Sequence, residues 1–132
     1  MRLLIVGLLV TFPLVAEKFL LKPTDTAPVA TGEVDVNRDE YGDSKIDLTV
    51  DHLARAAELS PAHHVYVVWV QPSPGAAQNM GELKVGDDLK GQFKAVTPLR
   101  NFDVFITAET DPQTPQPRGP VVMRAAVHQT GK

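Results

Sequence analysis

The chain lacks cysteine and has no cluster of basic residues, and each absence excludes a class of protein. Without cysteine there is no disulfide, thiolate-bound zinc, cysteine nucleophile or acylated lipoprotein cysteine. Acidic residues outnumber basic residues by 16 to 13, which gives a formal net charge of −3. Because a surface of that sign repels phosphate backbones, we expect no nucleic-acid partner.

The length and the turn residues favour a single domain of short strands. At 132 residues the chain is long enough to bury a core of its own. Its 11 prolines and 9 glycines indicate many turns. No βαβ spacing and no repeat of fixed period is present, so neither a parallel sheet nor a solenoid is expected.

A short apolar run opens the chain. Met1 and Arg2 precede a run of mostly leucine and valine that ends at Ala16. A basic start followed by a run too short to span a bilayer comfortably is typical of a signal peptide. We therefore predict a signal peptide over residues 1–16 and an exported protein, periplasmic or extracellular. Because Leu14 stands where a small residue is expected before cleavage, an uncleaved tether and a buried core segment are the alternatives.

The next segments predict a linker and then a β-hairpin. Residues 17–30 contain two prolines and no hydrophobic period, which predicts a linker. Residues 31–36 and 46–50 alternate apolar and polar side chains and are joined by a polar loop in which Gly42 can adopt a positive φ. Residues 52–60 could form one or two helical turns or an irregular crossover.

The most apolar stretch of the chain is residues 64–71. Its residues are β-branched or aromatic on both alternating faces, so as a strand it would be covered on both sides. We therefore predict a central strand here, with Trp69 as an anchor in the core.

Four later segments complete about seven strands: residues 79–85, 89–96, 101–109 and 121–127. Turn signals separate them, and the proline-rich residues 111–120 form a long loop. This spacing predicts an all-β protein, an antiparallel immunoglobulin-like β-sandwich over residues 31–128, with a tail over 129–132.

Several of these segments carry a likeness to a known family. The segments are Tyr66-Val67-Val68-Trp69, Met80-Gly81-Glu82-Leu83, Phe102-Asp103-Val104-Phe105-Ile106-Thr107-Ala108-Glu109, and Gly119-Pro120-Val121-Val122 after a proline-rich stretch. Together they resemble the extracytoplasmic C-terminal domain of anti-sigma-K factors, over roughly residues 30–127. The resemblance implies a β-sandwich held outside the membrane. It does not imply sigma-factor binding, because only Met1 and Arg2 precede the apolar run and the His/Cys zinc pattern is missing.

The chemically reactive residues form no recognisable catalytic or metal site. Residues 37–43 place oxygen ligands at alternate positions as in a calcium loop, but Leu48 stands where the bidentate acid should be. His63 and His64 are adjacent and on a strand would point to opposite faces. No serine lies in a G-x-S-x-G turn, and no base and nucleophile can be paired. We expect no catalytic residue, no metal, no cofactor and no enzymatic activity.

Two aromatic residues are the candidate binding residues, Tyr66 and Phe105. Phe105 shares its strand face with polar neighbours and could mark a contact patch, but cover by a neighbouring loop, such as the proline-rich one, is the favoured interpretation. Two functions remain open. One is a non-catalytic interaction or sensor-like module of the bacterial cell envelope with a protein partner; the other is a secreted domain that binds carbohydrate or another small ligand through exposed aromatics.

Overall fold

Strands and turns make up almost all of the described chain. The computed structural model describes residues 16–129, and these contain eight strands and one short 3-10 helix. The elements are β1 (Glu17–Pro23), β2 (Thr31–Arg38), β3 (Ser44–Asp51), η1 (Ala56–Glu58), β4 (Val65–Gln71), β5 (Gln78–Leu83), β6 (Gly91–Thr97), β7 (Asn101–Glu109) and β8 (Val121–His128). Every pair of neighbouring strands is antiparallel, so the predicted all-β antiparallel class is confirmed. The predicted signal peptide lies outside the described residues except for Ala16.

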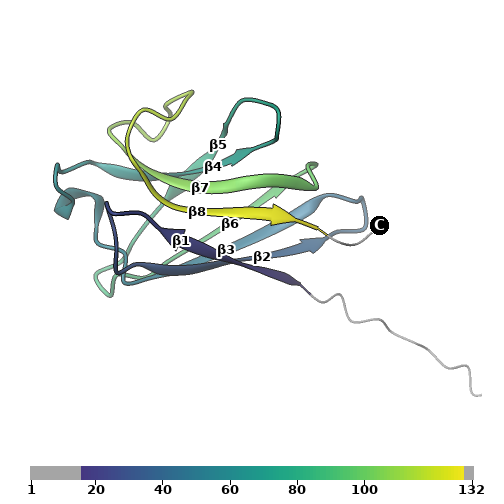
Figure 1. The fold of residues 1–132 in the computed structure, drawn as a ribbon, viewed down its shortest axis with the longest axis horizontal. Helices are drawn as coiled ribbons and strands as arrows, with labels where there is room; N and C mark the ends of the chain where they lie inside the picture. The colour runs from purple at the N-terminus through teal and green to yellow at the C-terminus, as the bar shows by residue number, and fades with distance from the viewer. Residues whose placement is uncertain (1–15, 130–132) are drawn as a thin grey trace, which may run out of the picture.

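The strands form one sheet that curls until its two end strands approach each other (Figure 1). Their order is β5-β4-β7-β8-β1-β2-β3-β6. The bend falls at β1, whose residues 17–21 pair with β2 while Lys22 and Pro23 pair with β8. At the other side β5 contacts β6, and a bridge joins Val85 to Gly91. The sheet is therefore nearly barrel-shaped, with β1 shared between its two halves.

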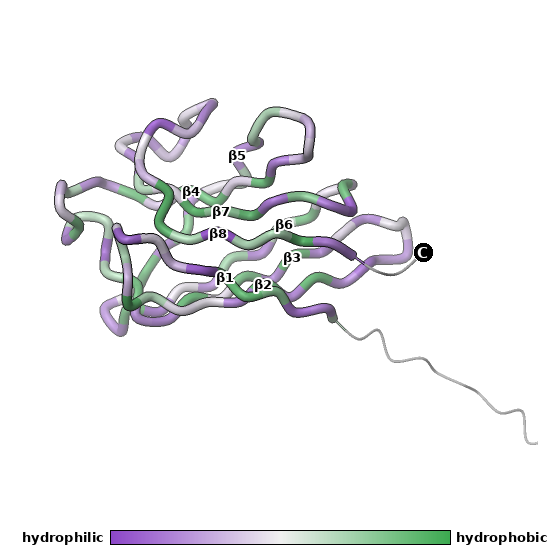
Figure 2. The backbone as a smooth tube through the Cα atoms, viewed as in Figure 1, coloured by the Kyte–Doolittle hydropathy of each residue, from purple (hydrophilic) through white to green (hydrophobic). Residues whose placement is uncertain are grey.

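The inner faces of the two halves meet in the main hydrophobic core. The core contains Leu48 from β3, Val68 from β4 and Ile106 from β7, each at most 1% exposed. Figure 2 shows most hydrophobic stretches on the strands and most hydrophilic stretches on the loops. Since apolar side chains from distant parts of the chain share this core, its burial is the main force holding the halves together.

The prediction of a doubly covered strand at residues 64–71 is confirmed by β4. This strand lies between β5 and β7, and its residues 66–70 are all buried. Trp69 is 0% exposed, and its indole Nε1 donates a hydrogen bond of 2.7 Å to Thr107 Oγ1. An indole N–H buried without an acceptor is costly, so this bond makes the full burial of Trp69 possible.

The predicted hairpin is also confirmed. β2 and β3 pair along their whole length, from Thr31 opposite Asp51 to Arg38 opposite Ser44. Gly42 in the connecting loop has a φ of 84°, a conformation that other residues adopt only at a cost. Between β3 and β4 the chain crosses to the other half of the sheet, and η1 is the single helical turn in that crossover.

The prediction of a linker over residues 17–30 is wrong, because its first half is β1. Phe19 and Leu21 point toward the core while Leu20 points away, which is the alternation of a half-buried strand. Pro23 is the last residue of this strand and lies opposite Met123 of β8. The added strand explains why the structure has eight strands where about seven were expected.

Two adjacent leucines in β1 allow a test of this correction. Leu21 is 3% exposed and Leu20 is 73% exposed. We expect Leu21→Ala to lower the free energy of unfolding by about 2–4 kcal/mol, because it removes buried surface and leaves a cavity. Leu20→Ala should change it by less than about 0.5 kcal/mol. Urea unfolding of both variants measures this, and equal effects would mean that residues 17–23 do not form a strand with one buried face.

Candidate functional site

Neither aromatic candidate presents its ring to solvent. Tyr66 is 2% exposed and Phe105 is 3% exposed, so the expectation that they form an exposed ligand platform is wrong. They lie on opposite faces of the same half of the sheet. Tyr66 belongs to the main core, whereas Phe105 packs with Val67 and Trp69 in a second, outer cluster.

Phe105 is buried because a neighbouring strand and a ring cover it. Its ring stacks on Trp69 at a centroid distance of 6.3 Å, and the Arg124 guanidinium lies 4.4 Å from its centroid. Arg124 is held there by an ion pair of 3.2 Å with Asp103. The alternation of the sequence placed Phe105 on the correct face, but a cation and a second ring exclude water from that face.

Glu109 attaches the proline-rich loop to the sheet. Glu109 is 2% exposed, and its carboxylate accepts hydrogen bonds from the backbone N–H groups of Arg118 and Gly119, the shortest at 3.1 Å. A Cβ on Gly119 would overlap the Ala108 carbonyl oxygen. The loop therefore returns so close to β7 that only glycine fits, and a buried acid is satisfied by backbone donors there.

A second attachment ties the same loop to β5. Asn79 Nδ2 donates hydrogen bonds of 2.9 Å to the carbonyl oxygens of Pro112 and Thr114. Val121, which follows the loop, and Ala77 from the β4–β5 connection pack against the outer cluster. The outer cluster of this half is thus covered by the loop, by Arg124 and by these two side chains, while Ala126 on β8 stays exposed.

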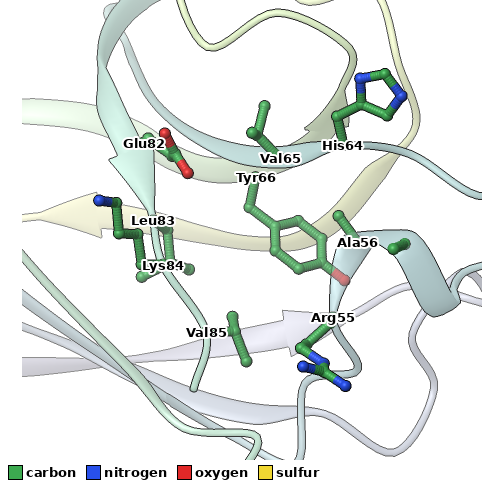
Figure 3. Close-up of a pocket in the computed structure, with 10 residues that line it drawn as sticks. Arg55, Ala56, His64, Val65, Tyr66, Glu82, Leu83, Lys84 and Val85 are labelled. Carbon is green, nitrogen blue, oxygen red and sulfur yellow. The ribbon is translucent and has the colours of Figure 1, made fainter. Parts of the chain in front are cut away.

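A groove lies between η1 and the adjoining ends of β4 and β5 (Figure 3). Its volume is about 330 Å³, and Tyr66, Leu83 and Val85 contribute to its apolar wall. The Tyr66 hydroxyl donates a hydrogen bond to the Ala54 carbonyl oxygen. Burial, and secondarily the negative charge of Glu58, raises the pKa of Tyr66 to about 12.

The polar side chains around this groove do not converge on one point. In Figure 3 the Lys84 amine and the His64 ring are directed away from the Tyr66 ring. Arg55 is engaged by Glu58 at 3.0 Å and by Asp87 at 2.9 Å. No base, acid and nucleophile therefore point into a shared space here, and the groove offers a hydrophobic wall with a charged rim.

The other polar motifs are explained by local structure. Asp39 Oδ1 accepts hydrogen bonds of 2.9 Å from the N–H groups of Tyr41 and Asp43, so this carboxylate stabilises its own turn. His63 Nδ1 lies 2.9 Å from the Pro61 carbonyl oxygen. Within residues 16–129 no group of three or more histidine, aspartate or glutamate side chains is placed to hold a metal ion.

The outer face of the half formed by β1, β2, β3 and β6 differs from the closed face. Its outward side chains are exposed or half-buried along all four strands. The strand registers place Lys18 opposite Asp35, Asp35 opposite Asp47, and Asp47 opposite Lys94. We call these four residues the charge row. It crosses all four strands in the order positive, negative, negative, positive.

Within the charge row the two acids are unpaired. The ion pairs among the described residues include neither Asp35 nor Asp47, since the Lys18 amine lies 3.9 Å from Glu33 instead. Asp35 Oδ1 is buried and has no hydrogen-bond partner, while Asp47 Oδ1 accepts one from Gln92. Like charges directly opposite each other destabilise a sheet, so the centre of this row is unfavourable as it stands.

Sequence reasoning missed the charge row. The alternation of residues 31–36 and 46–50 placed both acids on a polar face, but the flanking lysines come from β1, which was assigned to a linker, and from β6.

Comparison with protein-family models and with curated proteins finds no match to the chain. Among residues 16–129 no helix is long and apolar enough to cross a membrane.

Glu109 provides a test of the loop attachment. Glu109→Gln keeps the size of the side chain but replaces one carboxylate oxygen with an amide NH₂ group. That group is a donor and would face the backbone N–H groups of Arg118 and Gly119. We expect it to lower the free energy of unfolding by about 1.5–3 kcal/mol and to accelerate hydrogen exchange at the amides of Arg118 and Gly119. The half-buried Glu82, changed to Gln, is the matched control. Unchanged exchange at those two amides would contradict the role given to Glu109.

The titration of Tyr66 tests whether its side chain is buried in the wall of the groove. Tyr41→Phe leaves Tyr66 as the only tyrosine, and its ultraviolet titration should then show one transition near pH 12 instead of the ordinary 10.0. Because the unfolded chain loses this proton first as pH rises, the free energy of unfolding should fall between about pH 10 and 12, by on the order of 2 kcal/mol. Tyr66→Phe should remove that fall. A midpoint near pH 10 would show that Tyr66 is solvated.

Proposed function

We propose that this chain is an exported, non-catalytic immunoglobulin-like β-sandwich that acts as an interaction or sensor-like module of the bacterial cell envelope. The partner is a protein in that envelope. Membrane contact is limited to the N-terminal segment if that segment stays uncleaved. The likeness to anti-sigma-K factors extends to the exported sandwich and not to sigma-factor binding.

The connectivity of β2 to β8 supports the immunoglobulin-like part of this proposal. Strands β2, β3 and β6 are neighbours in one half, and β5, β4, β7 and β8 follow one another in the other half. In immunoglobulin naming this is A-B-E opposite C′-C-F-G, with the chain crossing between the halves after B, C′ and E. β1 is then an additional strand that joins A to G.

The observation that carries the interaction role is the contrast between the two outer faces. One face is closed by an attached loop, a cation over an aromatic ring and a second apolar cluster. The other face is open and carries charges in a fixed register. A rigid scaffold that leaves one charged face open is suited to recognition of another surface.

The groove beside η1 supports a second candidate function, the binding of a small ligand. Its volume of about 330 Å³ is near the lower limit for ligand sites, and its wall is partly apolar. The divergent directions of His64 and Lys84 make it the weaker candidate, because a small ligand needs polar groups that converge.

Two measurements in cells test the interaction role. Fractionation of cells that produce the full chain with a C-terminal tag should place it outside the cytoplasm; full-length protein in the cytosol would contradict export. In intact cells, a photocrosslinking residue at Thr49 on the open face should form one discrete protein adduct. The same residue at Ala126, exposed on β8, is the control. Equal yields at the two positions would contradict a role of the open face.

A further inference from the structure

The centre of the open face brings two carboxylates side by side. Asp35 and Asp47 are directly opposite each other on β2 and β3, and neither forms an ion pair within the described residues. A positive group between the two carboxylates would remove their repulsion and gain two charge-assisted contacts. The centre of the charge row is therefore complementary to one cation supplied from outside.

The two ends of the charge row have the opposite sign. Lys18 and Lys94 are both exposed and lie on the outermost strands of this half. Three strand spacings separate them, about 14 Å. In an extended peptide, residues i and i+4 lie on the same face and are also about 14 Å apart, with residue i+2 midway. A peptide that crosses the strands can therefore present an acid to each lysine and a base to the aspartates.

We propose that the charge row docks an extended segment of a partner protein with the pattern acid-x-base-x-acid, where the central base is arginine or lysine. This inference rests on the proposed interaction role and specifies the chemistry of the partner. A groove of about 390 Å³, lined by Lys45, Lys94 and Val96 among others, lies on the same half beside the row.

A second copy of this chain is a poorer occupant of the same face. A two-fold axis parallel to the strands would bring Lys18 against Lys94 and Asp35 against Asp47 of the other copy. A two-fold axis across the strands would bring each residue of the row against itself. Both arrangements oppose like charges, which disfavours an isologous dimer through this face.

The test uses a peptide probe and the full chain after export. The probe is acetyl-Thr-Glu-Thr-Arg-Thr-Glu-Thr-amide, and its control is acetyl-Thr-Arg-Thr-Glu-Thr-Glu-Thr-amide, which has the same composition and net charge in a different order. Since exposed ion pairs are individually weak, a Kd on the order of 1 mM is expected for the probe at low salt. Amide shifts in NMR spectra should move at residues 33–37 and 45–49 on β2 and β3.

One comparison changes the order of residues in the peptide, and two others change the charges of the protein. We expect the control peptide to bind at least fivefold more weakly than the probe. The double change of Asp35→Asn and Asp47→Asn should weaken binding of the probe at least fivefold without lowering the thermal midpoint of the free protein. The change of the exposed acids Asp25→Asn and Glu40→Gln, which lie in loops away from the row, should leave probe binding unchanged.

A reversal of charge keeps the proposal testable if the double aspartate variant is poorly folded. Changing Lys18→Glu and Lys94→Glu should reverse the preference, so that acetyl-Thr-Arg-Thr-Arg-Thr-Arg-Thr-amide binds more tightly than the original probe. Equal binding of the probe and its reordered control, shifts on another face, or no shifts up to 10-fold above the expected Kd would each overturn the proposal.

The oligomeric state and the cellular crosslink separate the remaining outcomes. A dimer in sedimentation that is lost in the double aspartate variant would overturn the proposal in favour of a second copy. If the peptides fail while Thr49 still forms its discrete adduct, the interaction role stands and only the stated chemistry of the partner fails. If the protein remains in the cytosol, the proposed function itself fails, whatever the peptides do.

Discussion

The structure depends on the burial of β4 on both of its faces. Tyr66, Val68 and Val70 belong to the main core, while Val67 and Trp69 belong to the outer cluster. A strand that is apolar on both faces needs a cover on each side, because exposing either apolar face to water would be unfavourable. The other half of the sheet supplies the inner cover, and the outer cover has to come from loops and side chains.

The long loop and its unusual polar attachments follow from that need. A loop laid over an apolar face brings backbone groups out of water, and each needs a hydrogen-bond partner. Thr107 and Glu109, which point outward from β7, meet this requirement for the Trp69 indole and for the amides of Arg118 and Gly119. Polar residues on that face are therefore part of a closed interface and not a sign of exposure.

Local patterns in the sequence were enough to predict some elements. The alternation of residues 31–36 and 46–50 predicts the hairpin of β2 and β3, and the apolar stretch 64–71 predicts the buried β4. β1 was missed because Pro23 and Pro28 indicated a linker and residues 17–23 do not alternate apolar and polar side chains. The alternating burial of Phe19, Leu20 and Leu21, which identifies the strand, is visible only in the structure.

The covered state of Phe105 and the charge row depend on contacts distant in sequence. The polar strand neighbours of Phe105 do not tell what covers it, and only the pairing of β7 with β8 brings Arg124 over its ring. The charge row likewise needs the register of four strands taken from three parts of the chain. Alternation gives the face of a side chain, but it cannot give the neighbour across the ladder.

The charge row has little to contribute to the stability of its own half. Directly beneath it, Val34, Val36, Ile46 and Leu48 are at most 3% exposed, so burial on the inner face already holds β2 and β3 together. Because the outer face is not needed to hold β2 and β3 together, it can keep two like charges opposite each other, Asp35 and Asp47, without loss of the fold. Departures from local consistency concentrate at functional sites in natural proteins, and here the departure coincides with the face that no loop covers.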